Sequence, residues 1–320
     1  MTRIAILDDY QNVALELADW ASLGPNVEVV SFNEFLQTDE DRVSKALAGF
    51  DFVVGMRERT RFPASQLEKL PDLKMMVTTG MRNLAWDMKK ARAMGITVCG
   101  TAILPYPAFE QTWALIFAVT KEIPKEDRCM KAGGWQESFP VGLRGKTLGV
   151  IGLGKLGAQS AALGTALGMK VVAWSENLTD ERAAECNATR VSKEDLFKQS
   201  DVVTIHVLLS ERTTGLVGAD ELALMKPSAY IVNTSRGPII DETALIAALK
   251  ANKIKGAGID VYDVEPLPTD HALRKLDNAV LTGHTGYVIR ENYEVMYPEA
   301  VECIKSWMAG SPVRVLNAED

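Results

Sequence analysis

The sequence predicts an α/β fold built from two doubly wound parallel-sheet domains, and three observations support this prediction. The first hundred residues alternate short β-rich runs with amphipathic helical stretches. A second alternation begins near residue 147, where an apolar strand leads into a glycine-rich turn and a helix of small residues. A helix predicted for residues 290–308 has a register that returns it to the first domain. We therefore predict one discontinuous domain, residues 1–104 with 288–320, and one continuous domain, residues 105–287.

The first domain is predicted to contain five strands with helices between them. These strands are Arg3–Leu7, Val27–Ser31, Phe52–Val54, Lys74–Thr78 and Thr97–Cys99. After the Pro105-Tyr106-Pro107 break, the apolar stretch Glu110–Val119 predicts a buried helix that crosses between the domains. Residues Lys121–Arg144 are polar and contain Gly133-Gly134, which predicts an irregular segment.

The second domain opens on the most specific local pattern in the chain. The strand Thr147–Ile151 runs into a G-x-G-x-x-G turn formed by Gly152, Gly154 and Gly157, and a helix over Leu156–Leu167 follows. The first glycine permits the tight turn, the second lets the backbone approach a pyrophosphate, and the third lets the helix pack on the strand. This context predicts a dinucleotide site. The later strands are predicted at Lys170–Trp174, Val202–His206, Tyr230–Asn233, Gly258–Asp260 and Ala279–Leu281.

Composition excludes several other classes of protein. The 320 residues are 47% hydrophobic and 24% charged, as in a globular chain, and the net charge of −7 without a basic run argues against nucleic acid or a membrane as the main partner. The four cysteines lack C-x-x-C spacing and the chain has three histidines, so we predict neither a metal site nor a disulfide framework. The N-terminus reads as a strand, which favours a cytoplasmic protein.

Three charged side chains follow successive strands of the second domain. Arg236, Glu265 and His284 come after the strands that end near Asn233, Asp260 and Leu281. Ligands of an open parallel sheet bind at the carboxyl ends of its strands. A guanidinium binds a carboxylate, an imidazole moves a proton, and a carboxylate keeps the imidazole protonated. Together these groups match a substrate in which a carbonyl lies beside a carboxylate. Taken singly, each residue is more typical of a structural role than of a catalytic one.

Four motifs together resemble the D-isomer-specific 2-hydroxyacid dehydrogenase family over essentially the whole chain. They are VIGLGKLG at 150–157, NTSRGPIID at 233–241, GIDVYDVEPLP at 258–268 and LTGHTGYV at 281–288. The resemblance implies a Rossmann domain in the middle of the chain, a flavodoxin-like substrate domain built from both ends, and an active site in the cleft between them. It also implies a homodimer, formed through the Glu110–Val119 helix and the Lys121–Arg144 segment.

The resemblance assigns roles to individual residues. Arg236 would bind the substrate carboxylate, His284 would donate the proton during hydride transfer, and Glu265 would raise the pKa of His284. Asp260 would bond the nicotinamide carboxamide. Backbone amides of the turn at residues 79–83 would hold the substrate carboxylate, and the candidate substrate-binding residues there are Thr79, Gly80, Met81 and Arg82. Arg82 is an unusual extra cation, which suits either a second anionic group on the substrate or a salt bridge.

The chain departs from the commonest family pattern near the histidine. Gly283 stands where a proline usually precedes the catalytic histidine, which loosens the backbone at His284. Tyr287 stands where a small residue is common. With Tyr106 and Met81 it either lines a narrow substrate pocket or serves in packing.

The choice between NAD and NADP depends on the end of the second strand. Ser175 occupies the position where an NAD enzyme usually carries an acid for the ribose 2′-hydroxyl. Ser175, Asn177 and Arg182 suit a 2′-phosphate, whereas Glu176 disfavours one, so both cofactors stay open with NADP slightly favoured. The candidate cofactor-binding residues are Gly152, Gly154, Lys155, Leu156, Gly157, Ser175, Glu176, Asn177, His206, Thr234, Asp260 and Gly286.

Two other functions remain as alternatives to a 2-keto acid reductase. A nicotinamide-dinucleotide-sensing protein, similar to a co-repressor of this fold, would keep the nucleotide site with little catalysis. A nucleotide-dependent hydrolase with a Rossmann core would lack the ordered Arg, Glu and His set. The sequence does not indicate which 2-keto or 2-hydroxy acid is the substrate, because all of them share the carboxylate and carbonyl groups.

Overall fold

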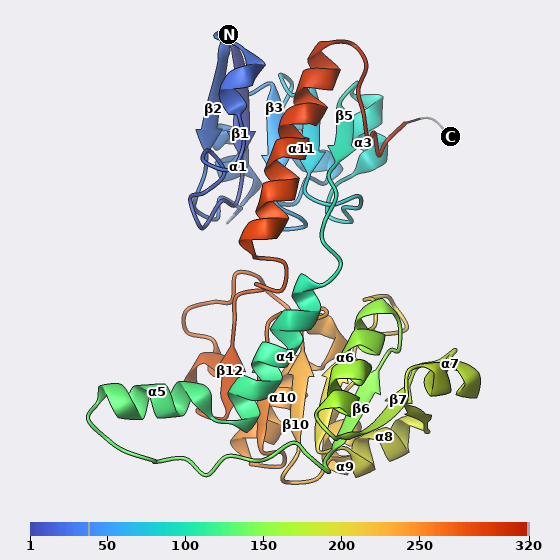
Figure 1. Ribbon diagram of the computed structural model, residues 1–320. Coiled ribbons are helices and arrows are strands. Elements are labelled where there is room, and N and C mark those ends of the chain that lie inside the picture. Colours follow the sequence, from blue (N-terminus) through green and yellow to red (C-terminus); the bar gives the residue numbers. More distant parts are fainter. Residues whose placement is uncertain (38, 319–320) are drawn as a thin grey trace. The chain divides into compact units, whose positions relative to one another are not determined.

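The computed structural model describes residues 1–37 and 39–318, and the chain packs as two compact units (Figure 1). One unit contains Met1–Leu104 and the C-terminal segment that begins at Val288; the other contains Pro105–Tyr287. Every strand pair in both sheets is parallel. The predicted class, two doubly wound α/β domains, is confirmed.

The first unit has a five-stranded sheet in the order β2-β1-β3-β4-β5. The chain runs from β1 to β2 on one side and then returns to β3 on the other, so the strand order reverses between β1 and β3. Such a reversal leaves a crevice at the carboxyl ends of the two strands. The strands are β1 (Thr2–Ile6), β2 (Val27–Ser31), β3 (Phe52–Gly55), β4 (Met75–Thr78) and β5 (Thr97–Gly100).

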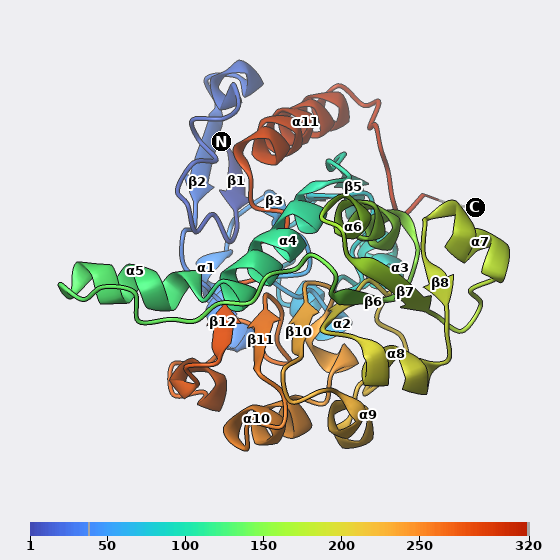
Figure 2. The same cartoon turned by 60° about the horizontal axis from the view of Figure 1, so that its bottom comes forward.

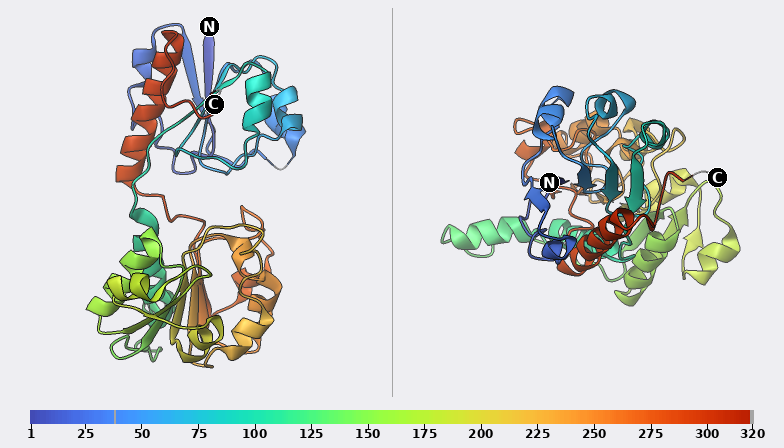
Figure 3. Two further views of the ribbon diagram at one scale, coloured as in Figure 1. Left: turned by 90° about the vertical axis from the view of Figure 1, so that its right-hand side faces the viewer. Right: turned by 90° about the horizontal axis from the view of Figure 1, so that it is seen from above.

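Helices cover both faces of this sheet, and the last long helix returns to it as predicted. Helix α11 (Arg290–Met308) contacts β4 and β5, and Figure 3 shows it, in red, on the face opposite the α-helices of the N-terminal segment. The chain after α11 then joins β5, because the Leu316 N–H donates to the Val98 carbonyl at 2.7 Å. The remaining helices are the 3-10 turn η1 (Trp20–Leu23), α1 (Glu40–Ala46), α2 (Ala64–Glu68) and α3 (Met88–Ala93).

The second unit has a seven-stranded sheet in the order β12-β11-β10-β9-β6-β7-β8. Its strand order reverses between β6 and β9. The predicted strands are confirmed with shifts of one or two residues at their ends, and the two-residue strand β8 was not predicted. The strands are β6 (Thr147–Ile151), β7 (Lys170–Trp174), β8 (Thr189–Arg190), β9 (Val202–Ile205), β10 (Tyr230–Asn233), β11 (Gly256–Ile259) and β12 (Ala279–Leu281).

Helices lie on both faces of the seven-stranded sheet. Figure 2 shows α4 and α6 on one face and α8, α9 and α10 on the other. Alternate strand residues therefore enter two apolar clusters, so that Val150 and Val232 pack on one side and Ile151 and Ile231 on the other. The helices are α4 (Pro107–Thr120), α5 (Ile123–Lys131), α6 (Lys155–Ala166), α7 (Asp180–Glu185), α8 (Lys193–Gln199), α9 (Ala219–Leu224) and α10 (Glu242–Lys250), with the 3-10 turns η2 (Gly237–Ile239) and η3 (Ala272–Lys275).

One element was predicted wrongly. The segment Lys121–Arg144 was expected to be irregular, but its first part forms the helix α5. Pro124 stands in the first turn, Glu126 is acidic near the N-terminus, and Arg128 and Lys131 are basic near the C-terminus. These are helix-end signals, and the low hydrophobicity of the segment masked them.

Across the part of the chain that the structure describes, no helix combines the length and the apolar character that crossing a bilayer requires.

Candidate active site

The glycine-rich turn joins β6 to α6 in the way the motif requires. Gly152 has φ +91°, and a Cβ there would lie 2.8 Å from the His206 carbonyl oxygen. A Cβ on Gly157 would lie 1.9 Å from the Gly152 carbonyl oxygen, so helix and turn are in contact. Gly154 differs from both, because nothing lies within 4 Å of its Cβ position. The open space at Gly154 and the start of α6 directly after it fit a dinucleotide pyrophosphate.

His206 follows β9 at the strand-order reversal. Its N–H donates to the Ile151 carbonyl at 2.7 Å, which fixes the loop after β9 beside the glycine-rich turn. Its Nε2 is 3.0 Å from the Thr204 hydroxyl. Burial lowers the pKa of His206 to about 4, so the imidazole is neutral at neutral pH.

The residues at the end of β7 form a tight turn, in which the Leu178 N–H donates to the Ser175 carbonyl at 3.1 Å. Ser175 is half-buried, whereas Glu176 and Asn177 are exposed. Arg182, in α7, places Nη2 3.5 Å from the Leu153 carbonyl oxygen and Nη1 3.0 Å from Glu185. The Arg182 guanidinium therefore lies beside the glycine-rich turn.

Arg236 lies in the loop after β10, and side-chain hydrogen bonds shape that loop. Asn233 Nδ2 donates to the Arg236 carbonyl at 2.9 Å, and the Ser235 hydroxyl donates to the Ile205 carbonyl at 2.7 Å. The Thr234 hydroxyl is 2.6 Å from that of Thr112 in α4. The loop then passes close to the backbone of Tyr262, where a Cβ on Gly237 would lie 2.1 Å from the Tyr262 carbonyl carbon.

Asp260 organises the loop that carries His284. This fully buried carboxylate accepts the N–H groups of Thr285 at 2.8 Å and Gly286 at 3.0 Å, and its backbone carbonyl accepts the His284 N–H at 2.6 Å. The structure thus gives Asp260 a role within the protein, alongside the one expected toward the nicotinamide. The loop was expected to be loose because Gly283 replaces a proline, but these bonds hold it.

His284 and Glu265 form a close pair. Nδ1 of His284 is 2.7 Å from Oε2 of Glu265, and the other carboxylate oxygen accepts the Tyr262 N–H at 3.0 Å. The side chains of His284 and Glu265 keep 18% and 23% of their surface exposed, so the pair is sheltered but reachable. His284 has φ +54°, an uncommon conformation for a residue other than glycine, and its ring meets Tyr287 edge-on.

The candidate substrate loop lies at the carboxyl ends of β3, β4 and β5 in the first unit. Two of its amides are already used, because the Thr79 N–H donates to the Gly55 carbonyl and the Gly80 N–H donates to the Thr101 hydroxyl, both at 3.1 Å. Among the described residues, the N–H groups of Met81 and Arg82 have no hydrogen-bond acceptor. If the loop binds a carboxylate through its backbone, these are the amides that remain.

Sequence reasoning missed two residues at these edges. The buried Tyr262 hydroxyl donates to the carbonyls of Ile259 at 3.1 Å and Thr282 at 2.8 Å, which ties the loops after β11 and β12 together, and burial raises its pKa. Arg57, after β3, lies across the Thr79–Gly80 peptide. Arg57 follows the end of a strand, and this signal, which identified Arg236, could also have identified Arg57.

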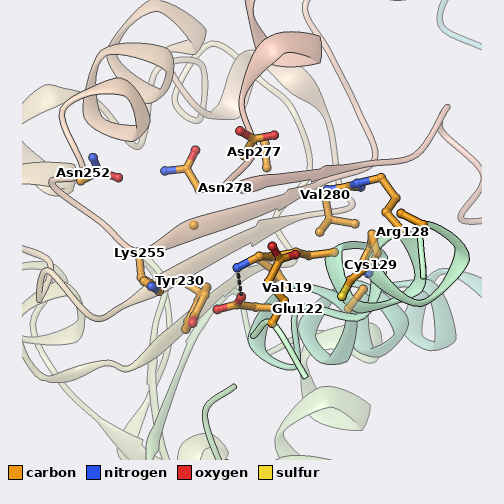
Figure 4. Close-up of a pocket in the computed structure, with 17 residues that line it drawn as sticks. Val119, Glu122, Arg128, Cys129, Tyr230, Asn252, Lys255, Asp277, Asn278 and Val280 are labelled. Carbon is orange, nitrogen blue, oxygen red and sulfur yellow. Dashed lines mark ion pairs between the residues drawn. The ribbon is translucent and has the colours of Figure 1, made fainter. Parts of the chain in front are cut away.

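A pocket of about 640 Å³ lies at the other end of the second sheet. Tyr230, Gly256 and Ala279, the first residues of β10, β11 and β12, line it together with Glu122 and Cys129 near α5 (Figure 4). The pocket is therefore at the amino ends of the strands, whereas the glycine-rich turn and His284 are at the carboxyl ends.

Comparison with known proteins identifies the family. Residues 113–286 match the D-isomer specific 2-hydroxyacid dehydrogenase, NAD binding domain. A glyoxylate reductase of Aeropyrum pernix is 35% identical over 272 residues, which are 81% of either chain. A hydroxypyruvate reductase of Blautia hydrogenotrophica is 29% identical over 98% of this chain and 99% of its own.

Solved structures agree with this comparison. A crystal structure described as a putative D-3-phosphoglycerate dehydrogenase from Ralstonia solanacearum is 33% identical and superposes with a TM-score of 0.92 over 99% of this chain and 97% of its own. The chain therefore belongs to the D-isomer specific 2-hydroxyacid dehydrogenases, oxidoreductases that transfer a hydride between a nicotinamide dinucleotide and a 2-hydroxy or 2-keto acid.

Proposed function

We propose that this enzyme interconverts a 2-keto acid and the corresponding D-2-hydroxy acid, with Arg236, Glu265 and His284 as its catalytic residues. The observation that carries this proposal is the 2.7 Å contact between Glu265 and His284. This contact lies at the same carboxyl edge of the sheet as the glycine-rich turn. A proton-transfer group and a dinucleotide site on one edge are what a carbonyl reduction needs.

In this proposal His284 moves the proton. Glu265 Oε2 accepts a hydrogen bond from the Nδ1–H group of His284, so Nε2 of His284 faces the substrate. During reduction Nε2 donates a proton to the carbonyl oxygen of the substrate. The negative charge of Glu265 stabilises the imidazolium form of His284 that precedes donation. In the oxidation direction His284 Nε2 accepts the hydroxyl proton. A bound reduced nicotinamide supplies the hydride.

Arg236 binds the substrate carboxylate and polarises the adjacent carbonyl. Its Nη1 donates to the Ser235 carbonyl at 2.7 Å, which orients the guanidinium relative to its own loop. A guanidinium with a fixed direction recognises a carboxylate better than a free one, because less side-chain entropy is lost on binding. The loop of Thr79, Gly80, Met81 and Arg82 is proposed to bind a carboxylate through the N–H groups of Met81 and Arg82.

The cofactor is assigned to the carboxyl edge of the second sheet. Gly154 and the first residues of α6, Lys155 and Leu156, would hold the pyrophosphate, because nothing lies within 4 Å of the Cβ position of Gly154. Gly152 and Gly157 shape the turn, and His206, Thr234, Asp260 and Gly286 would contact the nicotinamide half. At the adenosine end, Ser175 and Asn177 would hydrogen-bond a 2′-phosphate and Arg182 would neutralise it, so we propose NADP over NAD despite Glu176.

The experiment follows the loss of reduced nicotinamide absorbance with NADH and NADPH separately, over a panel of 2-keto acids that includes glyoxylate, hydroxypyruvate and phenylpyruvate. We expect turnover of at least one acid, with a higher kcat/KM for NADPH. A preference for NADH would overturn the assignment of Ser175 and Arg182. Tight nucleotide binding without turnover of any acid would contradict the reductase and favour the nucleotide-sensing function.

We also propose that the enzyme is a homodimer in which residues 121–144, called the arm, pack on the second copy. Four large apolar side chains of the arm are exposed: Ile123 (55%), Met130 (50%), Trp135 (73%) and Phe139 (97%). The pocket at the amino ends of β10–β12 is bordered by the arm and contains the buried Tyr230 hydroxyl, which has no hydrogen-bond partner in the described chain (Figure 4). A two-fold dimer covers both features reciprocally.

Light scattering after size-exclusion chromatography tests this assembly. We expect a dimer for the natural chain and a monomer, or a concentration-dependent mixture, for the double variant Trp135→Ser/Phe139→Ser. The control is Met308→Ser, which replaces an exposed apolar residue outside the arm. A monomeric natural chain would refute the dimer.

A further inference from the structure

The first unit contains a pair of buried thiols that the proposed reaction does not use. Cys99 is in β5, and Cys303 is in α11, the helix that packs on β4 and β5. Both side chains are free thiols and fully buried. The Cys303 Sγ is 3.6 Å from the carbonyl oxygen of Gly100, the residue after Cys99, and the Cys99 thiol donates a hydrogen bond to Cys303. Two thiols in contact on packed elements are the starting geometry of a disulfide.

A cation lies beside this pair. Arg314 belongs to the segment after α11, and its backbone has φ +52°, which is uncommon for a residue other than glycine. Its Nη2 donates to the Glu302 carboxylate at 2.6 Å, whereas its Nε is buried and has no hydrogen-bond acceptor among the described residues. The Glu299 carboxylate is 3.7 Å from Nε, which is longer than a hydrogen bond. Arg314 also interacts with the Cys303 sulfur, and a thiolate there would give the buried Nε an acceptor.

These neighbours make Cys303 the reactive member of the pair. The hydrogen bond from Cys99 and the charge of Arg314 lower the pKa of Cys303 to about 7, against the opposing effects of burial and of the Glu302 carboxylate. The same hydrogen bond, together with burial, raises the pKa of Cys99. Cys303 is therefore partly thiolate at neutral pH, while Cys99 keeps its proton. A thiolate beside a protonated thiol is the arrangement of cysteine pairs that react with peroxide.

The segment after α11 covers the pair. Val315 of this segment forms an antiparallel bridge with Cys99, and the Val313 carbonyl oxygen is 4.0 Å from the Cys303 Sγ. The segment lies at an edge of the five-stranded sheet, because β5 is the last strand in the order. Peripheral segments of this kind open locally at a lower cost in free energy than core strands do. A brief departure of the segment from β5 would expose both thiols to a small oxidant.

We propose that Cys99 and Cys303 are a site of reversible oxidation, at which hydrogen peroxide forms a disulfide between the two sequence segments of the first unit. The Cys303 thiolate attacks one peroxide oxygen, so that the S–O bond forms, the O–O bond breaks, and the leaving hydroxide takes a proton from solvent. The Cys99 sulfur then attacks the sulfenic sulfur of Cys303. The S–S bond forms, the S–O bond breaks, and the hydroxyl leaves as water with the Cys99 proton. The thiols lose two electrons, and peroxide is reduced to two waters.

The disulfide would join the two parts of a discontinuous unit. Residues 1–104 and the segment that begins at Val288 are connected in the chain only through the second unit, so non-covalent contacts hold them together. A bond between Cys99 and Cys303 joins them directly and restricts the unfolded chain, which stabilises the folded unit. This inference does not depend on the proposed function, because neither cysteine belongs to the proposed active site.

Peptide mass spectrometry after treatment with hydrogen peroxide tests the site. The reduced protein is oxidised, its remaining thiols are alkylated, and it is digested with trypsin in the absence of reductant. We expect residues 93–121 to be linked to residues 291–305, and dithiothreitol to remove the link. Cys129 and Cys186 are internal controls, since each keeps 9% of its surface exposed and is thus more exposed than the pair. The pair should react at least tenfold faster than either control.

Two results of this experiment would overturn the proposal. One is oxidation of Cys129 or Cys186 as fast as that of the pair, because exposure and not the environment of Cys303 would then decide reactivity. The other is oxidation of Cys303 to a sulfinic acid without a link to Cys99.

The pH dependence of link formation tests the role of Arg314. The rate should rise with pH around a midpoint near 7, the pKa of the Cys303 thiol. In Arg314→Met the midpoint should move up by at least one pH unit, because the thiolate loses its cation, and Arg314→Lys should restore most of this shift. The midpoint separates this role from a structural one, since looser packing changes the rate at every pH. An unchanged midpoint in Arg314→Met would overturn the role of Arg314.

A variant of the covering segment tests how the oxidant enters. The Asn317 side chain bonds the backbone of Val98 and Ile96 and so holds the segment on the sheet. Asn317→Ala should therefore speed link formation by about fivefold or more, the effect of losing hydrogen bonds that oppose opening. Equal rates in Asn317→Ala and in the natural chain would overturn this route of entry.

Calorimetry tests the effect of the link on stability. The oxidised natural chain should unfold at a temperature about 5 °C or more above that of the reduced chain. Peroxide should leave the unfolding temperature of Cys303→Ser unchanged, and Cys99→Ala provides a second variant that lacks the link. A linked chain that unfolds no later than the reduced chain would overturn the stabilising effect.

Discussion

The carboxyl edges of the two sheets hold their charged side chains in different ways. In the second unit, Glu265 and His284 are 2.7 Å apart and share a network of loops with the buried Asp260. In the first unit, the Arg57 guanidinium donates to the Thr79 carbonyl, and its nearest carboxylate is 3.7 Å away. A close acid–imidazole pair suits proton transfer, whereas a cation without a tight counter-charge suits anion binding. The distance from a charged side chain to its nearest opposite charge therefore indicates its function better than the residue type alone.

The largest expected effect is a loss of kcat at one of the two histidine–carboxylate pairs of the second unit and not at the other. His284→Ala should lower kcat by about 10²- to 10⁴-fold, the usual contribution of a general acid, while nucleotide affinity changes little. His271 is the control, because its Nε2 lies 3.0 Å from Glu242 in a similar pair that is outside the proposed catalytic set. His271→Ala should retain activity. Stopped-flow turnover and fluorescence titration with nucleotide measure both quantities, and near-normal activity of His284→Ala would disprove the acid–base assignment.

The next effect distinguishes two glycines of one turn. Gly157→Ala should destabilise the second unit by about 1–3 kcal/mol or more, because its Cβ meets the Gly152 carbonyl oxygen at 1.9 Å and the backbone cannot move aside cheaply. Gly154→Ala should fold normally, since nothing lies within 4 Å, but should weaken nucleotide binding at least tenfold. Thermal unfolding and nucleotide titration measure the two effects. Unchanged nucleotide affinity in Gly154→Ala would argue against the pyrophosphate position.

A smaller effect tests the glycine under Arg57. Gly80 and Gly95 have φ +104° and +75°, so alanine at either position should cost about 1–2 kcal/mol of stability. Nothing lies near a Cβ on Gly95, whereas a Cβ on Gly80 displaces the Arg57 guanidinium. Gly80→Ala should therefore cost more stability than Gly95→Ala. Chemical denaturation measures both losses, and equal losses would mean that the Arg57 guanidinium moves aside without cost.

The last prediction concerns the response of each unit to acid. The folded-state pKa of His206 is about 4 against 6.5 for a free histidine, so the unfolded chain takes up this proton first as pH falls. The second unit should therefore lose up to about 3 kcal/mol of stability between pH 6.5 and 4. Burial raises the pKa of Asp8 above its ordinary 3.8, so protonation of Asp8 has the opposite sign and stabilises the first unit in acid.

Hydrogen exchange followed by mass spectrometry resolves the two units peptide by peptide. His206→Asn should flatten the pH dependence of peptides in the second unit, and Asp8→Asn should do so in the first. The same pH slope in the natural chain and in His206→Asn would show that another group controls the acid response of the second unit.

The fold was predictable because its signals are local. Parallel strands buried on both faces appear as continuous apolar runs, and the glycine turn identified β6 and α6. The errors occurred where the local signal is weak. Helix α5 is polar, and its end signals were outweighed by the neighbouring glycines; β8 consists of two exposed residues.

The site was only partly predictable from residue types. The order of Arg236, Glu265 and His284 after successive strands indicated the chemistry, but the use of Asp260 to hold the His284 loop is a matter of long-range hydrogen bonds that no local pattern records. The same holds for the amides of Thr79 and Gly80, whose partners lie on neighbouring strands. The position of Arg57 after β3 is a local signal, but its contact with Gly80, 23 positions later, is not.

The return of the chain to the first sheet sets an order of events during synthesis. Asn317 accepts the Val98 N–H at 2.9 Å and donates to the Ile96 carbonyl at 2.8 Å, so the edge strand β5 is completed by a residue that follows the whole second unit in the sequence. The second unit is contiguous, from Pro105 to Tyr287. Because domains fold as units, the second unit can fold during synthesis while β4 and β5 still lack α11. These strands of the first unit are therefore made before the second unit but completed after it, and during that interval the apolar faces of β4 and β5 are open to chaperones.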